Sequence, residues 1–230
     1  QMRDLNSELM VNNYFKYFTE LANADGLKTY IESYGDGPFN ELDAGAQANI
    51  PMGEFWLKYN KRHIAGLTSV AHTNGKKLVS AEGFTAKKDM NWNFHPGIAR
   101  FDGDKALAMG LNELVFHRYA HQANTHVMPG MIMGYWGANH DRTQTWWDIA
   151  SKPWLEHITR SQFVLRQGLP MADILLFVGD GAPHTCQDRY RQIRLFNTSN
   201  MGSVRKIGWT FNIKYGAISF IHTKLNIRCG

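Results

Sequence analysis

The segment Lys77-Leu78-Val79-Ser80-Ala81-Glu82 is the clearest strand in the sequence, and a predicted helix stands on each side of it. The helix before it covers 59–74 and ends at Asn74-Gly75, and the helix after it lies near 104–111. Like the other predicted strands, it is mostly apolar instead of alternating, which is typical of strands buried on both faces of a sheet. This helix–strand–helix order predicts parallel strands joined by helical crossovers.

The same alternation of helix and strand extends in both directions along the chain. Further strands or extended segments are predicted at 27–33, 50–55, 114–117 and 172–178. Further helices are predicted at 5–24, 41–48 and 145–167, with a long loop at 122–144. In the first of these helices the apolar residues near helical spacing are Leu9, Tyr14, Tyr17, Phe18 and Leu21. The alternation fits both a doubly wound sheet and a (β/α)8 barrel.

Polar side chains near strand ends favour the barrel. These side chains, each at or just after the predicted end of a strand, are Glu32, Glu54, Glu82 and His117. The carboxyl ends of barrel strands converge on one face, and that face carries the active site. A complete barrel needs about 250 residues, and only about four or five βα units are present here. We therefore predict an α/β fold, a partial (β/α)8 TIM-type barrel with parallel strands.

Composition and charge argue against several other classes of protein. The net charge is +5, but the basic residues are scattered, so we expect neither a nucleic-acid nor a membrane partner. No apolar stretch is long enough for a transmembrane helix, and no signal peptide opens the chain at Gln1. The two cysteines, Cys186 and Cys229, provide neither a disulfide framework nor a metal-binding spacing. The aromatic share of 13% fits either a carbohydrate site or a Trp-rich core.

Glu82 is the sharpest candidate for catalysis. It directly follows a buried strand and precedes Gly83, so a rigid element would hold its carboxylate at a cleft, as acid–base chemistry requires. The alternative is a structural carboxylate that caps the next segment or pairs with Lys87 or Lys88. Glu32 and Glu54 stand in similar positions and have the same two interpretations.

The segment Phe116-His117-Arg118-Tyr119-Ala120-His121-Gln122 is the second candidate. Two His four residues apart bind a metal when they lie on a helix, but this segment leaves a strand, so the two side chains need not converge. We favour recognition of sugar hydroxyls over a zinc site, and a packed strand end remains open. Trp136, Trp146 and Trp147 are candidates for stacking on sugar rings, although one of the last two, at the start of a helix, is expected to face the core.

Several motifs occur in the order found in one family of sugar-cleaving enzymes. Over roughly residues 4–187 the sequence resembles glycoside hydrolase family 106, the α-L-rhamnosidases, and several motifs in succession make the match specific. The motifs that carry the resemblance are Pro51-Met52-Gly53-Glu54-Phe55-Trp56, Ala81-Glu82-Gly83-Phe84-Thr85, Phe116-His117-Arg118-Tyr119-Ala120-His121-Gln122, Pro129-Gly130-Met131, Thr145-Trp146-Trp147, Arg160-Ser161-Gln162 and Leu165-Arg166-Gln167-Gly168-Leu169-Pro170-Met171-Ala172-Asp173.

The resemblance implies hydrolysis of terminal α-L-rhamnosides in plant or microbial glycans, with inversion of configuration by a general acid and a general base. It assigns the base to Glu82 and places the acid before Gln1, outside this chain. It also implies calcium near the rhamnose, so that Glu54 and Glu32 would bind calcium or sugar hydroxyls. The complete enzyme is expected to be bacterial, and periplasmic or extracellular. The residues expected to line the sugar pocket are Glu32, Glu54, His117, Arg118, His121 and Trp136.

The resemblance fades after about Gln187, which suggests two parts. We expect a partial barrel domain at 1–187 and, at 188–230, a tail that is truncated or translated out of frame. Within this tail, 209–215 and 218–221 read as two strands of an irregular hairpin. As an isolated fragment without the acid, the chain is expected to be inactive. The alternatives are a non-catalytic carbohydrate-binding barrel and a metal-dependent hydrolase built on His117 and His121.

Overall fold

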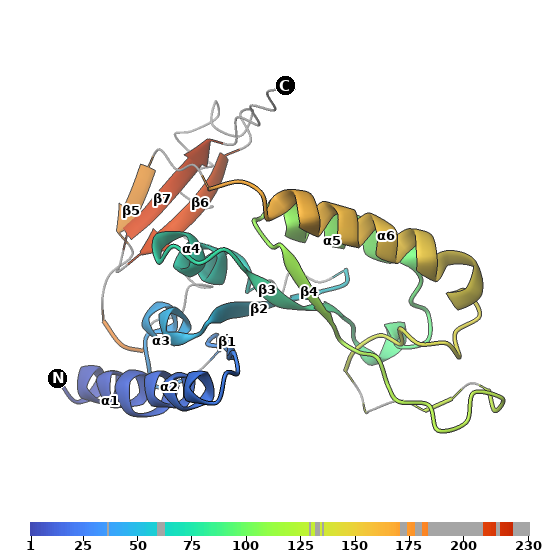
Figure 1. Cartoon of the computed structure of the whole chain (residues 1–230), viewed down its shortest axis with the longest axis horizontal. Coiled ribbons are helices and arrows are strands. Elements are labelled where there is room, and N and C mark those ends of the chain that lie inside the picture. The colour runs from blue at the N-terminus through green and yellow to red at the C-terminus, as the bar shows by residue number, and fades with distance from the viewer. Residues whose placement is uncertain are drawn as a thin grey trace. The chain divides into compact units, whose positions relative to one another are not determined.

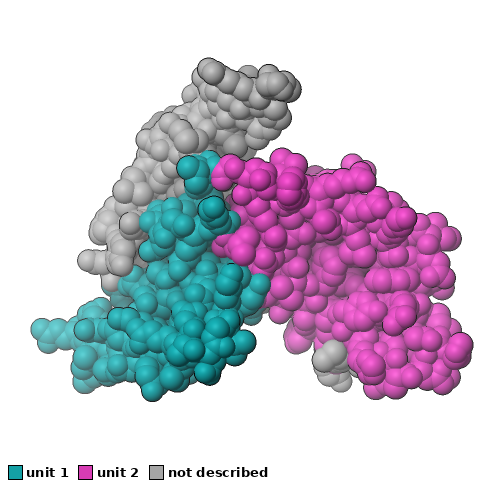
Figure 2. Space-filling model, in the orientation of Figure 1, with its two compact units in different colours: residues 1–51, 65–77, 169–230 teal, residues 52–64, 78–168 magenta. Residues whose placement is uncertain are grey.

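The computed structural model describes residues 1–35, 37–58, 63–128, 130–131, 134, 136–170 and 181–183, and the backbone of 174–177, 209–214 and 217–222. The chain divides into two units, which Figure 2 shows in different colours. Unit 1 comprises 1–51, 65–77 and 169–230, and unit 2 comprises 52–64 and 78–168. Each unit is described by itself.

Unit 1 begins with one continuous helical stretch. The predicted helix at 5–24 is confirmed as α1 (Met2–Met10), a turn of π-helix at Val11–Lys16 and α2 (Tyr17–Ala24), and Gly26 follows it with a φ of +74°. Its buried residues recur every fourth position, at Ser7, Val11, Phe15 and Thr19. The apolar residues that the sequence pattern singled out lie on the other side and are exposed: Leu9, Tyr14, Tyr17, Phe18 and Leu21.

Four strands form a sheet in the order in which they follow along the chain. They are β1 (Tyr30–Glu32), β2 (Ile50–Trp56), β3 (Ser80–Thr85) and β4 (Glu113–Phe116). β2 pairs with β3, and β3 with β4, in parallel. The helices between successive strands are α3 (Glu41–Gln47), α4 (Ala65–Thr73) and α5 (Pro96–Ala108). Parallel strands in sequential order with helical crossovers are the arrangement of a barrel wall, so the predicted α/β partial barrel is confirmed.

A β-bulge interrupts the pairing of β2 with β3. Glu54 pairs with Glu82, but the next pair is Trp56 with Thr85, so β3 carries one extra residue. Phe84 lies in this extra stretch with a φ of +63°, a backbone conformation that bulky residues rarely adopt. Because side chains alternate along a strand, the extra residue brings Thr85 onto the same face as Glu82.

An aromatic cluster fills unit 2 beneath this bulge. The Phe84 ring is 1% exposed, and Phe55 meets it edge to face with ring centroids 4.9 Å apart. The other rings within reach of Phe84 belong to Phe94, Phe116, His140 and Trp154. Trp154 comes from α6 (Trp147–Leu165), which lies beside α5 in unit 2 (Figure 1). Packing of the Phe84 ring therefore holds the unusual backbone of the bulge.

The strand predicted at 172–178 belongs to a different sheet from the one expected. It forms β5 (Ile174–Phe177), which pairs antiparallel with β7 (Ala217–His222), and β7 pairs antiparallel with β6 (Trp209–Lys214). The predicted hairpin of β6 and β7 is thus confirmed, whereas a parallel barrel position for β5 is wrong. A short apolar run shows that a strand is buried, but it does not identify the neighbouring strand.

Two helices differ in their bounds from the prediction. α4 begins at Ala65, while residues 59–62 of the predicted helix lie outside the described residues. α5 begins at Pro96, eight residues before the expected start, because a proline at the first helical position fits the fixed φ and needs no hydrogen-bond donor. In the part of the chain that the structure describes, no helix has both the length and the apolar content needed to cross a bilayer.

Candidate active site

Glu82 lies inside β3 and not after its end. The sequence placed the end of the strand at residue 82, but pairing with β4 continues to Gly83, and pairing with β2 continues through the bulge to Thr85. The side chain of Glu82 is nevertheless 25% exposed, so its carboxylate reaches solvent from a rigid strand. Glu54 likewise lies within β2, two residues before its end, whereas Glu32 ends β1 and His117 directly follows β4, as predicted.

Two polar side chains, those of Thr85 and His117, converge on Glu82. The Thr85 hydroxyl donates a hydrogen bond to Glu82 Oε1 at 2.7 Å, and His117 Nδ1 lies 3.1 Å from the same oxygen. Thr85 Oγ1 and His117 Nδ1 are also 3.1 Å apart. These contacts bring together two adjacent strands, since β3 supplies Glu82 and Thr85 and the end of β4 supplies His117. Glu82 Oε2 accepts no hydrogen bond from any described residue, so it is open to a further partner.

His117 is held in its neutral form. Burial lowers the pKa of His117, the Glu82 carboxylate raises it in part, and the Arg118 guanidinium lowers it again. Because the net pKa lies below its usual value, the ring is uncharged at neutral pH. A neutral imidazole beside a carboxylate acts as a hydrogen-bond donor through one nitrogen and as an acceptor through the other.

Glu54 has a different environment from that of Glu82. Its side chain is 11% exposed, Oε2 accepts a hydrogen bond from Trp56 Nε1 at 2.8 Å, and Oε1 lies 3.6 Å from His63 Nε2. The His63 backbone also donates to the Glu54 carbonyl at 2.9 Å, and this close approach requires Gly53, where a Cβ would lie 2.0 Å from the His63 carbonyl oxygen. Glu54 is therefore a tightly held carboxylate.

Trp136 reaches the same region from the long loop. Its ring meets the Trp56 ring edge to face with centroids 5.4 Å apart, and Trp136 is 56% exposed. Trp56 thus contacts both the Glu54 carboxylate and the exposed indole ring of Trp136. Of the other two candidates, Trp146 packs against Phe94 and Trp154 in the core, so the expectation that one of this pair faces inward is confirmed.

Arg118 and His121 have different surroundings. Arg118 Nη2 donates to the Gly134 carbonyl at 2.8 Å, and the Arg118 amide donates to Ala138 at 3.0 Å, so Arg118 fixes the long loop to the end of β4. His121 is exposed. Among the described residues, His117 and His121 belong to no group of three or more His, Cys or acidic side chains that could hold a metal ion, so the structure does not support the zinc site considered as an alternative.

The described residues do not form a complete calcium site. Calcium takes about six to eight oxygen ligands, and among the described residues no group of three or more acidic, His or Cys side chains could hold a metal ion. Both Glu54 carboxylate oxygens already have neighbours in Trp56 and His63. Calcium at Glu54 therefore stays a prediction. Glu32, the other predicted ligand, is exposed at the end of β1 in unit 1.

Three residues of this region, Thr85, Trp56 and His63, could not be assigned to the site from the sequence. Thr85 stands three positions after Glu82, so strict alternation would place it on the opposite face of the strand, and only the bulge reverses this. Trp56 lies two residues after Glu54 on the same face of β2, and His63 contacts Glu54 although it stands nine residues later in the sequence. Beneath the site, His140 is fully buried, and burial together with the nearby His117 lowers the pKa of His140 to about 3.

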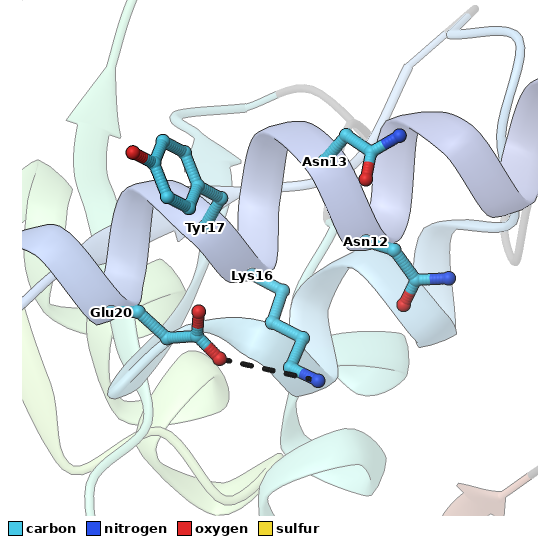
Figure 3. A pocket seen from close by; sticks show the side chains of 5 residues that line it. All are labelled: Asn12, Asn13, Lys16, Tyr17 and Glu20. Atoms are coloured by element: carbon cyan, nitrogen blue, oxygen red, sulfur yellow. Dashed lines mark ion pairs between the residues drawn. The ribbon is translucent and has the colours of Figure 1, made fainter.

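A depression on the N-terminal helix in unit 1 is not a competing site. It is open to solvent, and Figure 3 shows the side chains that line it, which are Asn12, Asn13, Lys16, Tyr17 and Glu20. Its two charged groups, Lys16 and Glu20, pair with each other at 4.0 Å on the exposed helix surface. Such an exposed pair contributes little and leaves no net charge to attract a ligand.

Comparisons with known proteins identify the family of this chain. The family model described as alpha-L-rhamnosidase, of glycoside hydrolase family 106, matches residues 1–195. A protein of Formosa agariphila, named provisionally as a beta-glucuronidase, is 38% identical over 182 residues, which are 77% of this chain and 15% of that protein. The structure of a rhamnosidase from Novosphingobium sp. PP1Y is similar with a TM-score of 0.71 and 27% identity, over 76% of this chain and 18% of that chain.

This chain thus spans less than a fifth of the length of each of these two relatives. The family match covers all of unit 2, including β3, β4 and the loop that carries Trp136, and the residues of unit 1 up to 195. Motif order, parallel barrel strands and the matched model agree, and the chain belongs to glycoside hydrolase family 106.

Proposed function

We propose that this chain supplies the general base and part of the sugar-binding surface of an inverting glycoside hydrolase that removes terminal α-L-rhamnose from glycans. The observation that carries the proposal is the Glu82 carboxylate. It is partly exposed, it stands on a rigid strand, and it is held through Oε1, while Oε2 accepts no hydrogen bond from the residues that the structure describes. A carboxylate in this state can orient a water molecule and accept its proton.

The reaction requires a second carboxyl group. In an inverting glycosidase the base removes a proton from water as the water oxygen bonds to the anomeric carbon, and an acid protonates the leaving oxygen. The two carboxyl groups stand roughly 6.5–9.5 Å apart, which leaves room for the water. Glu54 pairs with Glu82 on the neighbouring strand, but its carboxylate is largely buried and bound to Trp56. We therefore assign Glu54 to support of the site and place the acid outside this chain.

Neighbouring side chains suit sugar recognition. The exposed Trp136 indole presents a flat apolar face of the kind that covers the apolar face of a sugar ring. His117 offers a second nitrogen that no described residue uses, and this nitrogen can contact a sugar hydroxyl. Arg118 acts through the loop that it holds, because its guanidinium donates to Gly134. We infer no role for His121 from its exposed position.

The name of the Formosa agariphila relative suggests a second substrate. A β-glucuronide carries a carboxylate on the sugar, which a rhamnoside lacks. Arg118 is the cation beside Glu82 and His117, and its guanidinium is already bound to the loop carbonyl of Gly134. The apolar Trp136 surface and the matched rhamnosidase structure favour the neutral 6-deoxy sugar.

A substrate that needs no acid tests the proposal on this chain. α-L-Rhamnosyl fluoride has a leaving group that departs without protonation, so the base alone suffices. We expect the 230-residue chain to release fluoride slowly, to form β-L-rhamnose first, and to leave ordinary aryl rhamnosides intact. Glu82→Gln is expected to lose fluoride release by a factor of about 100 or more, the usual contribution of a general base.

The same assay separates the alternatives. Binding of L-rhamnose without fluoride release would instead indicate a non-catalytic carbohydrate-binding barrel. Release from β-D-glucuronosyl fluoride and not from the rhamnosyl compound would transfer the assignment to glucuronides. Rapid hydrolysis of aryl rhamnosides by the chain would show that the acid lies within it.

A further inference from the structure

Thr85 is the most buried polar side chain in contact with Glu82. It is 1% exposed, and its hydroxyl oxygen lies 2.7 Å from Glu82 Oε1 and 3.1 Å from His117 Nδ1. The two partners are themselves 3.1 Å apart, so the three atoms form a closed triangle. A buried hydroxyl with two such partners has little freedom to rotate away.

The fold places this hydroxyl by means of the bulge at Phe84. In a regular strand residues 82 and 85 point to opposite faces. The extra residue in β3 turns Thr85 to the face of Glu82, and the Phe84 ring fills the aromatic cluster on the other side, with Phe55 4.9 Å away. Bulges often redirect a side chain next to an active site. Packing of the Phe84 ring in the aromatic cluster thus fixes the position of the Thr85 hydroxyl, although Thr85 is not part of the cluster.

The protons in the triangle can be assigned from chemistry. Thr85 has one hydroxyl proton and directs it to Glu82 Oε1. An ionised carboxylate only accepts hydrogen bonds, so His117 Nδ1 must carry a proton, because a bare lone pair 3.1 Å from that oxygen would be repelled. In the neutral ring Nε2 is then the unprotonated nitrogen.

We propose that Thr85 is a positioning residue, whose hydroxyl holds Glu82 and His117 so that Glu82 offers Oε2 to the reacting water and His117 offers Nε2 as an acceptor to a sugar hydroxyl. This inference rests on the proposed function of Glu82 as the base. Thr85 touches neither sugar nor water and acts through its two partners. The arrangement selects a substrate that donates a hydroxyl proton to His117 while its anomeric carbon faces Glu82.

Nitrogen NMR of the histidine rings in the 230-residue chain tests the arrangement directly. At a pH where His117 is neutral, the chemical shifts of its two ring nitrogens show which one carries the proton. We expect the Nδ1–H tautomer in the wild-type chain, although a histidine side chain in water prefers Nε2–H. Thr85→Val is expected to shift the population toward Nε2–H, and Thr85→Ser, which keeps the hydroxyl, to restore the wild-type spectrum.

Thr143→Val is the matched control. Thr143 is also buried, and its hydroxyl also donates to a carboxylate, that of Asp141 in the loop before α6. The substitution removes the same atoms from a comparable hydrogen bond outside the Glu82 triangle. The His117 tautomer should therefore stay as in the wild-type chain.

Turnover of α-L-rhamnosyl fluoride gives a second measurement. Thr85→Val should lower kcat by roughly tenfold, the effect of one hydrogen bond to a charged group, with KM nearly unchanged. Thr85→Ser should recover most of the loss.

A wild-type Nε2–H tautomer overturns the inference, even if Thr85→Val fails to fold. So does a folded Thr85→Val chain with an unchanged tautomer and an unchanged kcat. These results are distinct from failure of the proposed function, which would appear as full fluoride release by Glu82→Gln while the Nδ1–H tautomer is present.

Discussion

Glu54 and Glu82 are directly paired on adjacent parallel strands, yet the surroundings of their carboxylates differ. Trp56 and His63 hold the Glu54 side chain, which is 11% exposed, whereas Glu82 is 25% exposed and the described residues contact only one of its oxygens. A carboxylate that is held on both oxygens supports structure, and one with an open oxygen can carry out proton transfer. The two glutamates therefore occupy paired positions in the sheet but have different roles.

Glu54→Gln should lower stability more than Glu82→Gln does. The substitution weakens the hydrogen bond from Trp56 Nε1 and places an amide beside His63 in a buried site. We expect a loss of about 1–3 kcal/mol in the free energy of unfolding, measured by urea denaturation. Glu82→Gln, in a more open site, should lose less than about 1 kcal/mol. Equal losses for the two variants would contradict the separation of roles.

Gly53→Ala should disrupt the turn that brings His63 over β2. A Cβ at position 53 would lie 2.0 Å from the His63 carbonyl oxygen, so one of the two backbones must move. We expect a loss of about 3 kcal/mol or more in the free energy of unfolding, together with release of the Glu54–His63 contact. Gly168→Ala is the control, because no atom lies within 4 Å of a Cβ there. Similar stabilities for both variants would show that the approach of His63 is not required.

The strand order could be predicted from the sequence, but the geometry around Glu82 could not. Apolar runs separated by helical segments give the parallel arrangement of β2, β3 and β4, since such runs depend only on burial. The bulge has no local signal, because a bulky residue such as Phe84 is a poor choice for a positive φ. Its conformation is set by distant rings of the aromatic cluster.

Contacts with residues distant in the sequence also explain the other differences between the predicted and the observed structure. Glu54 stands at a position that looks like a strand end, but its burial depends on Trp56 and on His63, which lies beyond the turn. The first helix shows an apolar pattern on two sides, and sequence alone did not show that the side with Val11 and Phe15 is the buried one. β5 has the composition of a buried parallel strand but pairs with β7.

His140 should make the chain sensitive to acid. Its ring is enclosed by Phe94, Phe116 and Trp154, and its two nitrogens have no hydrogen-bond partner among the described residues. Burial lowers the pKa of His140 from 6.5 to about 3 in the folded state. The unfolded chain therefore binds a proton that the folded chain excludes, and stability that is complete above pH 6.5 falls as the pH drops toward 3.

The slope of this loss is about 1.4 kcal/mol per pH unit for one proton. His140→Leu removes the titrating group and keeps an apolar side chain in the cluster. Urea unfolding of both chains between pH 7 and 5 should give curves whose difference changes with that slope below pH 6.5. Parallel curves would show that His140 titrates normally in the folded chain.

Trp136→Ala should weaken sugar binding with little effect on folding. The indole is 56% exposed, so its removal forfeits mainly the edge-to-face contact with Trp56, about 0.5–1.5 kcal/mol. We expect calorimetric binding of L-rhamnose to weaken by at least tenfold, because loss of the ring removes the platform for the sugar. Phe101→Ala is the control, since Phe101 is 74% exposed and lies within helix α5. Equal affinities in the two variants would remove Trp136 from the site.

The most direct measurement of the central claim is rescue of Glu82→Ala by azide, with α-L-rhamnosyl fluoride as substrate. Azide fits the space left by the carboxylate and needs no base. It should attack the anomeric carbon as fluoride leaves, and proton NMR should show β-L-rhamnosyl azide, with fluoride release rising with azide concentration. Formation of the α-azide, or absence of rescue in a correctly folded Glu82→Ala chain that still binds L-rhamnose, would contradict the assignment of Glu82 as the base of an inverting enzyme.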